Sequence, residues 1–259
     1  MKPLVIVTTF NRKRETEQML TSLLETTNLD EIELALVDNG STDGTYEFVK
    51  QWWQRTRPAG CLYALPRNIG CPRALNQALG KRQPGQPVVK LDNDLKILSP
   101  GWVQAVGEFV AQNERTAMVG AWYEGFEGNG RVKELRDRAF GLTAMGEGGF
   151  VRTWQMNLVI GHAVWHTGEF MDQIGYFDVL APEHLYGFED LILSAKAAHM
   201  EWPMLVWEGW AIENIQRANA LGRQGASEHI EQMRPLYNER VRMLANNGCL
   251  YTGSDGRPI

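Results

Sequence analysis

The sequence has few cysteines and no long apolar run. Cys61, Cys71 and Cys249 are too few for a disulfide framework, and their spacing matches no Cys-x-x-Cys or Cys/His metal motif. Such cysteine usage is typical of a reducing compartment, so we expect a cytoplasmic protein. The apolar run at residues 4–7 is shorter than that of a signal peptide, and no segment approaches the ~20 apolar residues of a membrane span.

Neither sign of charge dominates the chain. Its 26 Lys and Arg residues stand against 31 Asp and Glu residues, giving a formal net charge of −5 with both signs mixed along the sequence. This balance argues against a broad nucleic-acid-binding surface, although it leaves room for a local basic groove. The 259 residues, 44% of them hydrophobic, suffice for one large α/β domain or two small ones.

Three widespread site motifs are missing. The sequence has no Gly-x-Gly-x-x-Gly, which marks dinucleotide-binding folds, and no Gly-x-x-x-x-Gly-Lys-[Ser/Thr], which marks a P-loop. It also lacks the Gly-x-Ser-x-Gly turn that carries the nucleophile of many hydrolases. Enzymes of these three kinds therefore have no support.

The sequence does contain a regular alternation of apolar and amphipathic segments. Strand-length apolar runs occupy residues 4–7, 32–37, 61–65 and 88–91. Helical periodicity occupies residues 19–24, 45–53 and 74–79. Strand and helix in this rhythm predict a parallel sheet with right-handed crossovers.

The second half of the chain is less regular. We expect helices at residues 102–110, 191–198 and 227–247 and strands near residues 118–122, 158–161 and 202–207. Residues 124–149 are rich in glycine and charge, which predicts a long loop or hairpin. We expect this segment to close over a substrate, as catalytic lids do.

Two carboxylates, Asp92 and Asp94, follow the apolar run at residues 88–91 directly. The carboxyl ends of strands in an open α/β sheet are where ligands bind. Hard oxygen ligands of this kind suit Mg²⁺ or Mn²⁺, with substrate phosphates completing the coordination shell. The alternative is a solvated turn, because Asp-Asn-Asp is also a favourable turn sequence.

Five short motifs stand in a fixed order along the chain. They are Ile6-Val7-Thr8-Thr9-Phe10-Asn11-Arg12; Leu36-Val37-Asp38-Asn39-Gly40-Ser41-Thr42-Asp43-Gly44-Thr45; Arg67-Asn68-Ile69-Gly70 followed by Ala74-Leu75-Asn76; Leu91-Asp92-Asn93-Asp94; and Gly175-Tyr176-Phe177-Asp178 followed by Gly187-Phe188-Glu189-Asp190. Together they resemble glycosyltransferase family 2, a group of inverting transferases with the GT-A fold. The resemblance covers about residues 4 to 215.

The resemblance implies an α/β protein with the GT-A fold, in which a Rossmann-like, mostly parallel sheet is flanked by helices and followed by a C-terminal helical extension. Residues 1–98 are then the nucleotide-sugar-binding half. Residues 99–215 are the acceptor-binding and catalytic half of the same domain, and residues 216–259 are the extension.

The resemblance also assigns residues to the nucleotide sugar. They are Thr8, Phe10, Asn11, Arg12, Asp38, Asn39, Ser41, Arg67, Asn68, Gly70, Asp92 and Asn93. Asp38 corresponds to the acid that reads the base, although Asp-Asn-Gly-Ser also favours a turn that such an acid caps. The family often has Ala-Arg-Asn where this chain has Ala74-Leu75-Asn76, and Arg73 is the candidate to replace the missing cation.

For the metal, the resemblance matches Asp92 and Asp94 to the family's Asp-x-Asp motif, which binds Mn²⁺ or Mg²⁺. The family often supplies a late histidine as a further ligand, but residues 206–210 contain none. Glu208, Asn214 or water is therefore expected in its place.

For the chemistry, the resemblance makes Asp190 the general base, with Glu189 supporting the acceptor. The alternative is an acid that only stabilises a helix N-terminus. His162 is expected near the acceptor side, where a structural histidine is an equally good interpretation.

The implied reaction moves a sugar from a nucleotide diphosphate, most often UDP in this family, to an acceptor hydroxyl. The acceptor class stays open between a carbohydrate, a lipid, a protein, a small metabolite and a modified nucleobase, and the oligomeric state is unknown. Two other enzymes remain as alternatives, a sugar-nucleotide pyrophosphorylase and a phosphatase of the haloacid dehalogenase type. A non-catalytic nucleotide-sugar-binding module is a third.

Overall fold

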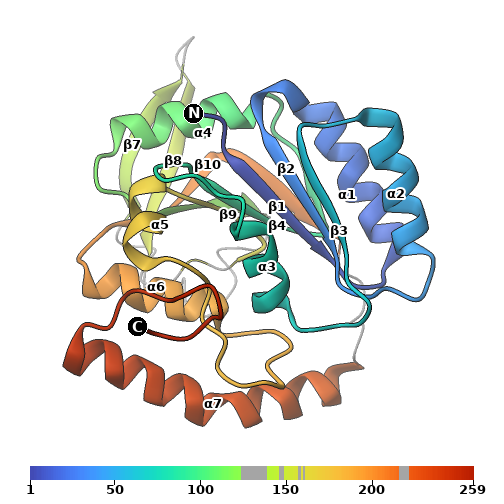
Figure 1. Cartoon of the computed structure of the whole chain (residues 1–259). Coiled ribbons are helices and arrows are strands. Elements are labelled where there is room, and N and C mark those ends of the chain that lie inside the picture. Colours follow the sequence, from blue (N-terminus) through green and yellow to red (C-terminus); the bar gives the residue numbers. More distant parts are fainter. Residues whose placement is uncertain (124–138, 146–148, 157–158, 160, 216–221) are drawn as a thin grey trace.

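The computed structural model describes residues 1–123, 139–145, 149–156, 159, 161–215 and 222–259 (Figure 1). Its elements in chain order are β1 (Leu4–Thr9), α1 (Lys13–Thr26), the short 3-10 helix η1 (Leu29–Glu31), β2 (Glu33–Asp38), α2 (Thr45–Thr56), β3 (Gly60–Ala64), α3 (Cys71–Leu79), β4 (Val88–Asp92), β5 (Leu95–Ile97), α4 (Trp102–Gln112), β6 (Met118–Tyr123), β7 (Ala139–Met145), β8 (Gly149–Met156), β9 (Ala163–His166), α5 (Gly168–Ile174), α6 (Glu189–His199), β10 (Met204–Asn214) and α7 (Gly222–Asn247). The alternation of strands and helices expected up to β4 is confirmed.

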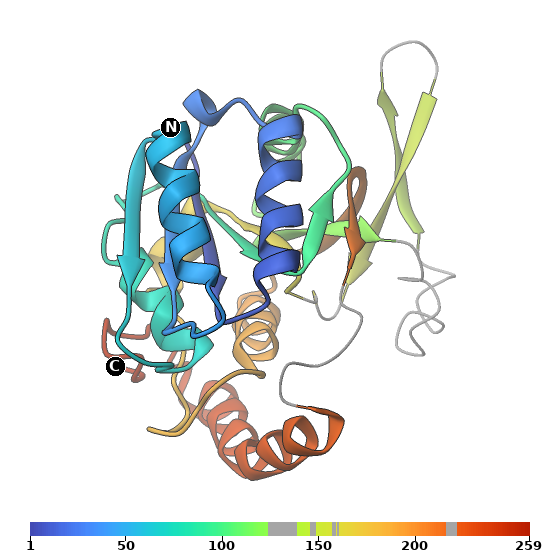
Figure 2. The same ribbon diagram turned by 90° about the vertical axis from the view of Figure 1, so that its right-hand side faces the viewer.

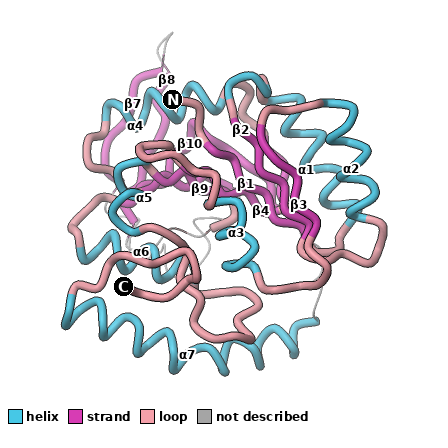
Figure 3. The backbone as a smooth tube through the Cα atoms, viewed as in Figure 1, coloured by secondary structure: helices cyan, strands magenta, loops and turns pink. Residues whose placement is uncertain are grey.

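In the part of the chain that the structure describes, ten strands form one sheet in the order β3-β2-β1-β4-β9-β6-β10-β8-β7, with β5 paired to the end of β10 (Figure 3). β3, β2, β1 and β4 run parallel, as do β6 and β10. β9 lies antiparallel between β4 and β6, and the β7–β8 hairpin adds antiparallel strands beside β10. The sheet is therefore parallel in the first half of the chain and mixed beyond it.

Helices cover both faces of this sheet (Figure 1). On one face α1, α2 and α4 bury side chains such as Met19 and Trp102 against the strands. On the other face α3, α5 and α6 do the same, with Leu75 and Phe170 in the core. Strands that are covered on both sides must be apolar on both sides, which explains the continuous apolar runs in the sequence.

α7 lies below these layers and packs along α6 (Figures 1 and 2). A buried charge network joins it to the rest of the protein. Asp178 accepts hydrogen bonds from Arg240 Nε of α7 at 2.5 Å and from Thr252 Oγ1 at 3.1 Å. Lys196 of α6 completes the network, with its Nζ 2.5 Å from Asp178 Oδ2. α7 and the C-terminal residues are thus tied to α6 and the segment before it through ionic groups that are themselves buried.

Several expected elements differ from the structure. The prediction of a strand at residues 158–161 is wrong for Val159 and Gly161. Neither residue lies in a strand, Gly161 lies in a turn, and the nearest strand that follows is β9. Residues 158 and 160 lie outside the described residues. The β7–β8 hairpin, which projects from the body in Figure 2, confirms a hairpin in the glycine-rich region. Residues 124–138 and 146–148, on which the expected lid depends, also lie outside the described residues.

No helix among the described residues combines the length and apolar character needed to span a bilayer.

Candidate active site

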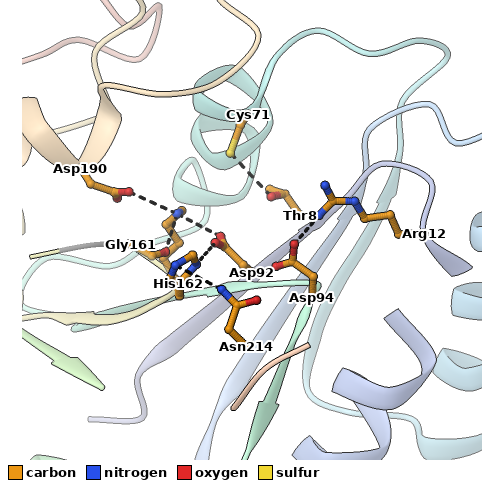
Figure 4. Close-up of polar contacts among 10 residues, drawn as sticks. Thr8, Arg12, Cys71, Asp92, Asp94, Gly161, His162, Asp190 and Asn214 are labelled. Atoms are coloured by element: carbon orange, nitrogen blue, oxygen red, sulfur yellow. Dashed lines mark hydrogen bonds and ion pairs between the residues drawn. The ribbon is translucent and has the colours of Figure 1, made fainter. Parts of the chain in front are cut away.

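The turn between β1 and α1 carries two residues in the left-handed region of backbone space. Asn11 has φ 56° and Arg12 has φ 64°, a conformation that costs energy for a residue with a branched or long side chain. The turn after β2 holds this conformation, because Asn11 N donates to Ser41 Oγ at 2.8 Å and Thr42 N donates to Asn11 Oδ1 at 2.9 Å. The result is that the guanidinium of Arg12 reaches the carboxylate of Asp94 (Figure 4).

Asp38, at the end of β2, is only 2% exposed. One carboxylate oxygen accepts a hydrogen bond from Thr9 Oγ1 at 3.1 Å, and the other accepts one from Ser41 N at 3.0 Å. Asp38 therefore fixes the two turns at this edge of the sheet, as the turn interpretation expected. Its contact with a nucleotide base stays a prediction.

Two asparagines lock the third loop of this edge. Asn39 Nδ2 donates to Asn68 Oδ1 at 3.1 Å, and Ile69 N donates to Asn39 Oδ1 at 2.9 Å. Asn68 Oδ1 also accepts Gly70 N at 2.8 Å. Gly70 has φ 91°, and a Cβ atom there would overlap the carbonyl of His184, so only glycine fits at this position.

Two of the expected nucleotide ligands have other uses in the structure. Arg73 donates to the carbonyls of Ala181 and Pro182, each at 2.9 Å, and so ties α3 to the segment before α6. Asn93 Nδ2 donates to Thr16 Oγ1 at 2.9 Å, inside the start of α1. The structure does not bring the Arg73 guanidinium to the Asp92–Asp94 pair. Phe10 is half-buried and Arg67 exposed at the same edge of the sheet as Thr8.

The centre of the site is a lysine that the motifs did not single out. Lys90, in β4, is 3% exposed. Its Nζ donates to the carbonyl of Gly161 at 2.6 Å and lies 3.0 Å from Asp92 Oδ1. On its other side lies Asp190 Oδ2, at 3.7 Å. Lys90 therefore joins the acid at the end of β4 to the acid at the start of α6.

His162 and Asn214 complete the cluster, as Figure 4 shows. His162 Nδ1 lies 3.2 Å from Asp92 Oδ2, and His162 Nε2 lies 3.5 Å from Asn214 Nδ2. Asn214 is the last residue of β10, and His162 immediately precedes β9. The structure thus brings Asp92, Asp94 and Asp190 into one cluster with an imidazole and an amide beside them.

The first turn of α6 presents Glu189 and Asp190. Phe188, before the helix, has φ 66° and is, after Asn11 and Arg12, a third non-glycine residue next to the site in the left-handed region. Glu189 Oε2 and Asp190 Oδ1 are buried, and neither oxygen has a hydrogen-bond partner among the described residues. A buried oxygen without a partner is costly, so each is an acceptor available to a bound group.

The two acids at the end of β4 have pKa values shifted in opposite directions, because their charged neighbours differ. Burial opposes the ionisation of Asp92, but Lys90 and His162 outweigh it and hold the pKa of Asp92 below its usual range. Burial and then the charge of Asp92 raise the pKa of Asp94, although Arg12 opposes this. Repulsion between two acids at this spacing is the condition that a divalent cation relieves.

Burial dominates the acids of α6. Burial and the neighbouring Asp190 raise the pKa of Glu189 to about 7. Burial also raises the pKa of Asp190, against the opposing charge of Lys90. Burial lowers the pKa of Lys90, but Asp190 and Asp92 overcome it and keep this pKa above its ordinary value. The lysine is therefore a fixed positive charge among carboxylates.

The side chains of this cluster are of kinds that can bind a hard divalent cation. Asp92 and Asp94 supply carboxylates, and an imidazole and an amide lie beside them. Within the described ranges, no three His, Cys, Asp or Glu side chains are already arranged to hold an ion. Glu208, the expected third ligand, forms an ion pair with Arg152, whose Nη2 lies 2.9 Å from Glu208 Oε1. The metal site stays a prediction, with Asp92 and Asp94 as its carboxylates and Asn214 beside them.

Lys90 is a residue that the motifs missed, and for His162, which was expected near the acceptor side, the motifs did not reveal its partners. A lysine between apolar neighbours in a strand buried on both faces is unusual, because buried lysines occur only with partners. That anomaly was visible in the sequence. His162 had no comparable signal, since its partners lie 70 residues before it and 52 residues after it.

The chain matches the family described as Glycosyl transferase family 2 over residues 4–169. No curated protein matches the sequence. Among solved structures, S. aureus TarS 1–349 in complex with UDP is 20% identical with a TM-score of 0.65, covering 95% of this chain and 67% of that chain. The mannosyltransferase PcManGT from Pyrobaculum calidifontis, in complex with GDP-Man and Mn²⁺, is 19% identical with a TM-score of 0.62, covering 96% and 76%.

GalNAc-T7 with UDP, GalNAc and Mn²⁺ is 14% identical with a TM-score of 0.62, covering 89% of this chain and 48% of that chain. The chain thus spans about half the length of that protein. At these identities the likeness is one of fold. Because the family match covers well over half of the chain and the fold agrees with it, the protein belongs to glycosyltransferase family 2, has the GT-A fold and is a glycosyltransferase.

Proposed function

We propose that the protein transfers a sugar from a nucleoside diphosphate sugar, with UDP as the preferred nucleotide, to an acceptor hydroxyl with inversion at the anomeric carbon. One observation carries the proposal: Asp92 and Asp94 lie at the end of β4 in one cluster with Asp190 of α6. Similar solved structures hold UDP, UDP-GlcNAc or GDP-Man, which supports a nucleotide-sugar donor.

The donor is proposed to lie across the carboxyl ends of β1, β2 and β4. The locked turns at Asn11, Asp38 and Asn68 give a preorganised edge there, and preorganisation reduces the entropy cost of binding. Arg12 supplies a positive charge next to Asp94, where the diphosphate is expected.

Asp94 and Asp92 are proposed to hold Mn²⁺ or Mg²⁺. When bound, the ion neutralises the charge that develops on the leaving diphosphate. Two of the similar structures contain Mn²⁺, which supports a divalent metal.

Asp190 is proposed as the general base. Its Oδ1 is buried and without a partner among the described residues, while Oδ2 faces Lys90. The acceptor oxygen bonds to the anomeric carbon as the bond from that carbon to the diphosphate breaks, and the hydroxyl proton passes to Asp190. Attack opposite the leaving group inverts the anomeric centre, and no covalent nucleophile is needed.

The test is hydrolysis of UDP-sugars in Mn²⁺, where water replaces the unidentified acceptor. Asp190→Asn removes the base, so kcat should fall by about 100-fold or more while the Kd for UDP stays within about threefold. Asp94→Asn should abolish the Mn²⁺-dependent part of UDP binding, measured by calorimetry. Glu231→Gln, in an exposed ion pair on α7, is the matched control and should behave as the wild type.

Two results would contradict the proposal. If Asp190→Asn keeps full kcat, Asp190 is not the base. If wild-type protein instead converts UDP-sugar and pyrophosphate into UTP and sugar 1-phosphate, the pyrophosphorylase alternative is correct. Binding measurements with GDP and dTDP in place of UDP test which nucleobase the donor site prefers.

A further inference from the structure

The structure contains a buried cation that links the donor side of the site to the acceptor side. We propose that Lys90 is a positioning residue, which holds the Asp190 carboxylate at a fixed place relative to the Asp92–Asp94 pair. The inference rests on the proposed function, because it needs Asp190 to be the base.

The direction of Lys90 follows from its strand. Successive side chains of β4 alternate between the two faces of the sheet. Val88 packs in the core with α3, α5 and α6, whereas Val89 and Leu91 pack in the core with α1, α2 and α4. Lys90 therefore points to the face that α6 covers, and its ammonium group ends beneath the first turn of that helix.

Three oxygen atoms surround the ammonium group of Lys90; one accepts a hydrogen bond from it and two carboxylate oxygens form ion pairs with it. These are the Gly161 carbonyl at 2.6 Å, Asp92 Oδ1 at 3.0 Å and Asp190 Oδ2 at 3.7 Å. Each oxygen comes from a different segment of the chain. A lysine held in this way fixes the spacing between two carboxylates that would otherwise repel each other.

Gly161 confines Asp190 from another side. A Cβ atom on Gly161 would overlap the carboxylate of Asp190, so the carboxylate rests directly on the backbone of Gly161. The same glycine accepts the hydrogen bond from Lys90. One carboxylate oxygen is thereby directed to Lys90, and the other is left for the acceptor hydroxyl.

The competing explanation is that Lys90 is only a counter-charge that stabilises the fold. The protein offers a matched comparison in Lys196, which is fully buried, lies on α6 and pairs with Asp178 away from the site. Loss of either lysine leaves buried carboxylates uncompensated and should destabilise the protein. Only the loss of Lys90 should also affect the chemical step.

The experiment measures UDP-sugar hydrolysis and UDP affinity for Lys90→Met, Lys90→Ala and Lys196→Met, at a temperature where circular dichroism shows each variant folded. Lys90→Met should lower kcat by about 100-fold, the scale of a displaced catalytic group, with the Kd for UDP changed less than about tenfold. Lys196→Met should keep kcat within about threefold. Methylammonium should restore part of kcat in Lys90→Ala and leave the kcat of Lys196→Met unchanged.

Two outcomes would overturn the inference. One is a folded Lys90→Met protein with wild-type kcat, and the other is a loss of UDP affinity as large as the loss of kcat. If Lys90→Met does not fold, Lys90→Gln carries the same test, because its amide still donates hydrogen bonds but has no charge. In the Asp190→Asn background, Lys90→Met should have no further effect on kcat.

Failure of the proposed function has a different signature. It appears as absent hydrolysis in the wild type or full activity in Asp190→Asn, whatever Lys90 does.

Discussion

At the scale of single residues, the Glu189–Asp190 pair sets the protonation of the site. Both carboxyl pKa values are raised, first by burial, and that of Glu189 to about 7. A base acts only when deprotonated, so kcat should be low in acid and rise with pH through an apparent pKa above the ordinary carboxyl range. Because the two acids are coupled, the measured value belongs to the pair.

The measurement is kcat for UDP-sugar hydrolysis from about pH 5 to about pH 9. Glu189→Gln removes a negative neighbour, which lowers the pKa of Asp190 and should move the acid limb to lower pH. Lys90, Asp92 and His162 also face Asp190, so the comparison is made with all three unchanged. A flat profile across this range would contradict the assignment of Asp190 as base.

Also at this scale, the sequence motifs predicted the acids of the site but not Lys90, the cation that lies among them. Asp92, Asp94 and Asp190 follow a strand or open a helix, which are local contexts that a pattern reveals. The partners of Lys90 lie in other segments, at Gly161 and Asp190, so only the fold brings them together. Arg73 shows the converse, because its guanidinium binds the carbonyls of residues 181 and 182, which the motifs did not indicate.

At the scale of elements, long apolar or strongly periodic segments were predictable and short ones were not. β1 and β2 are buried on both faces and contain continuous apolar runs, and β4 is apolar between residues 88 and 91 except for Lys90. β5 has three residues and α5 has seven, too few for a period to emerge. β9 gains its place from pairing with β4 and β6, which are distant in the sequence.

The approach of α6 to the segment before β9 is also an element-scale feature, and Gly161 makes it possible. Gly161→Ala should displace the Asp190 carboxylate, because the new Cβ would occupy its position. We expect kcat to fall by about 100-fold with UDP affinity preserved. The measurement is the same hydrolysis and calorimetry as above.

Gly107→Ala is the matched control, since a Cβ atom on Gly107 of α4 meets nothing within 4 Å. It should keep kcat and stabilise the protein by about 1 kcal/mol through helix propensity. Full activity in Gly161→Ala would mean that Asp190 need not stay where the structure has it.

At the scale of the whole molecule, Asp178 holds α7 and the C-terminal residues to α6. It is the shared partner of Lys196, Arg240 and Thr252, all at most 4% exposed. Nη1 and Nη2 of Arg240 have no hydrogen-bond partner among the described residues. The buried charge of Arg240 is therefore compensated by the Asp178 carboxylate. Asp178→Asn should therefore cost about 3–5 kcal/mol of unfolding free energy, the scale of a broken buried ion pair.

Urea unfolding measures this loss, and the double variant Asp178→Asn/Arg240→Met separates its causes. Removing the Arg240 guanidinium, which Asp178→Asn leaves without a partner, should recover part of the stability, so the two changes should be non-additive. Glu231→Gln, in a fully exposed pair with Arg234, should leave the urea midpoint unchanged. Because Asp178 does not contact the site acids, folded Asp178→Asn should retain the wild-type kcat. A loss of kcat without a loss of stability would instead place α7 and the C-terminal residues in the catalytic machinery.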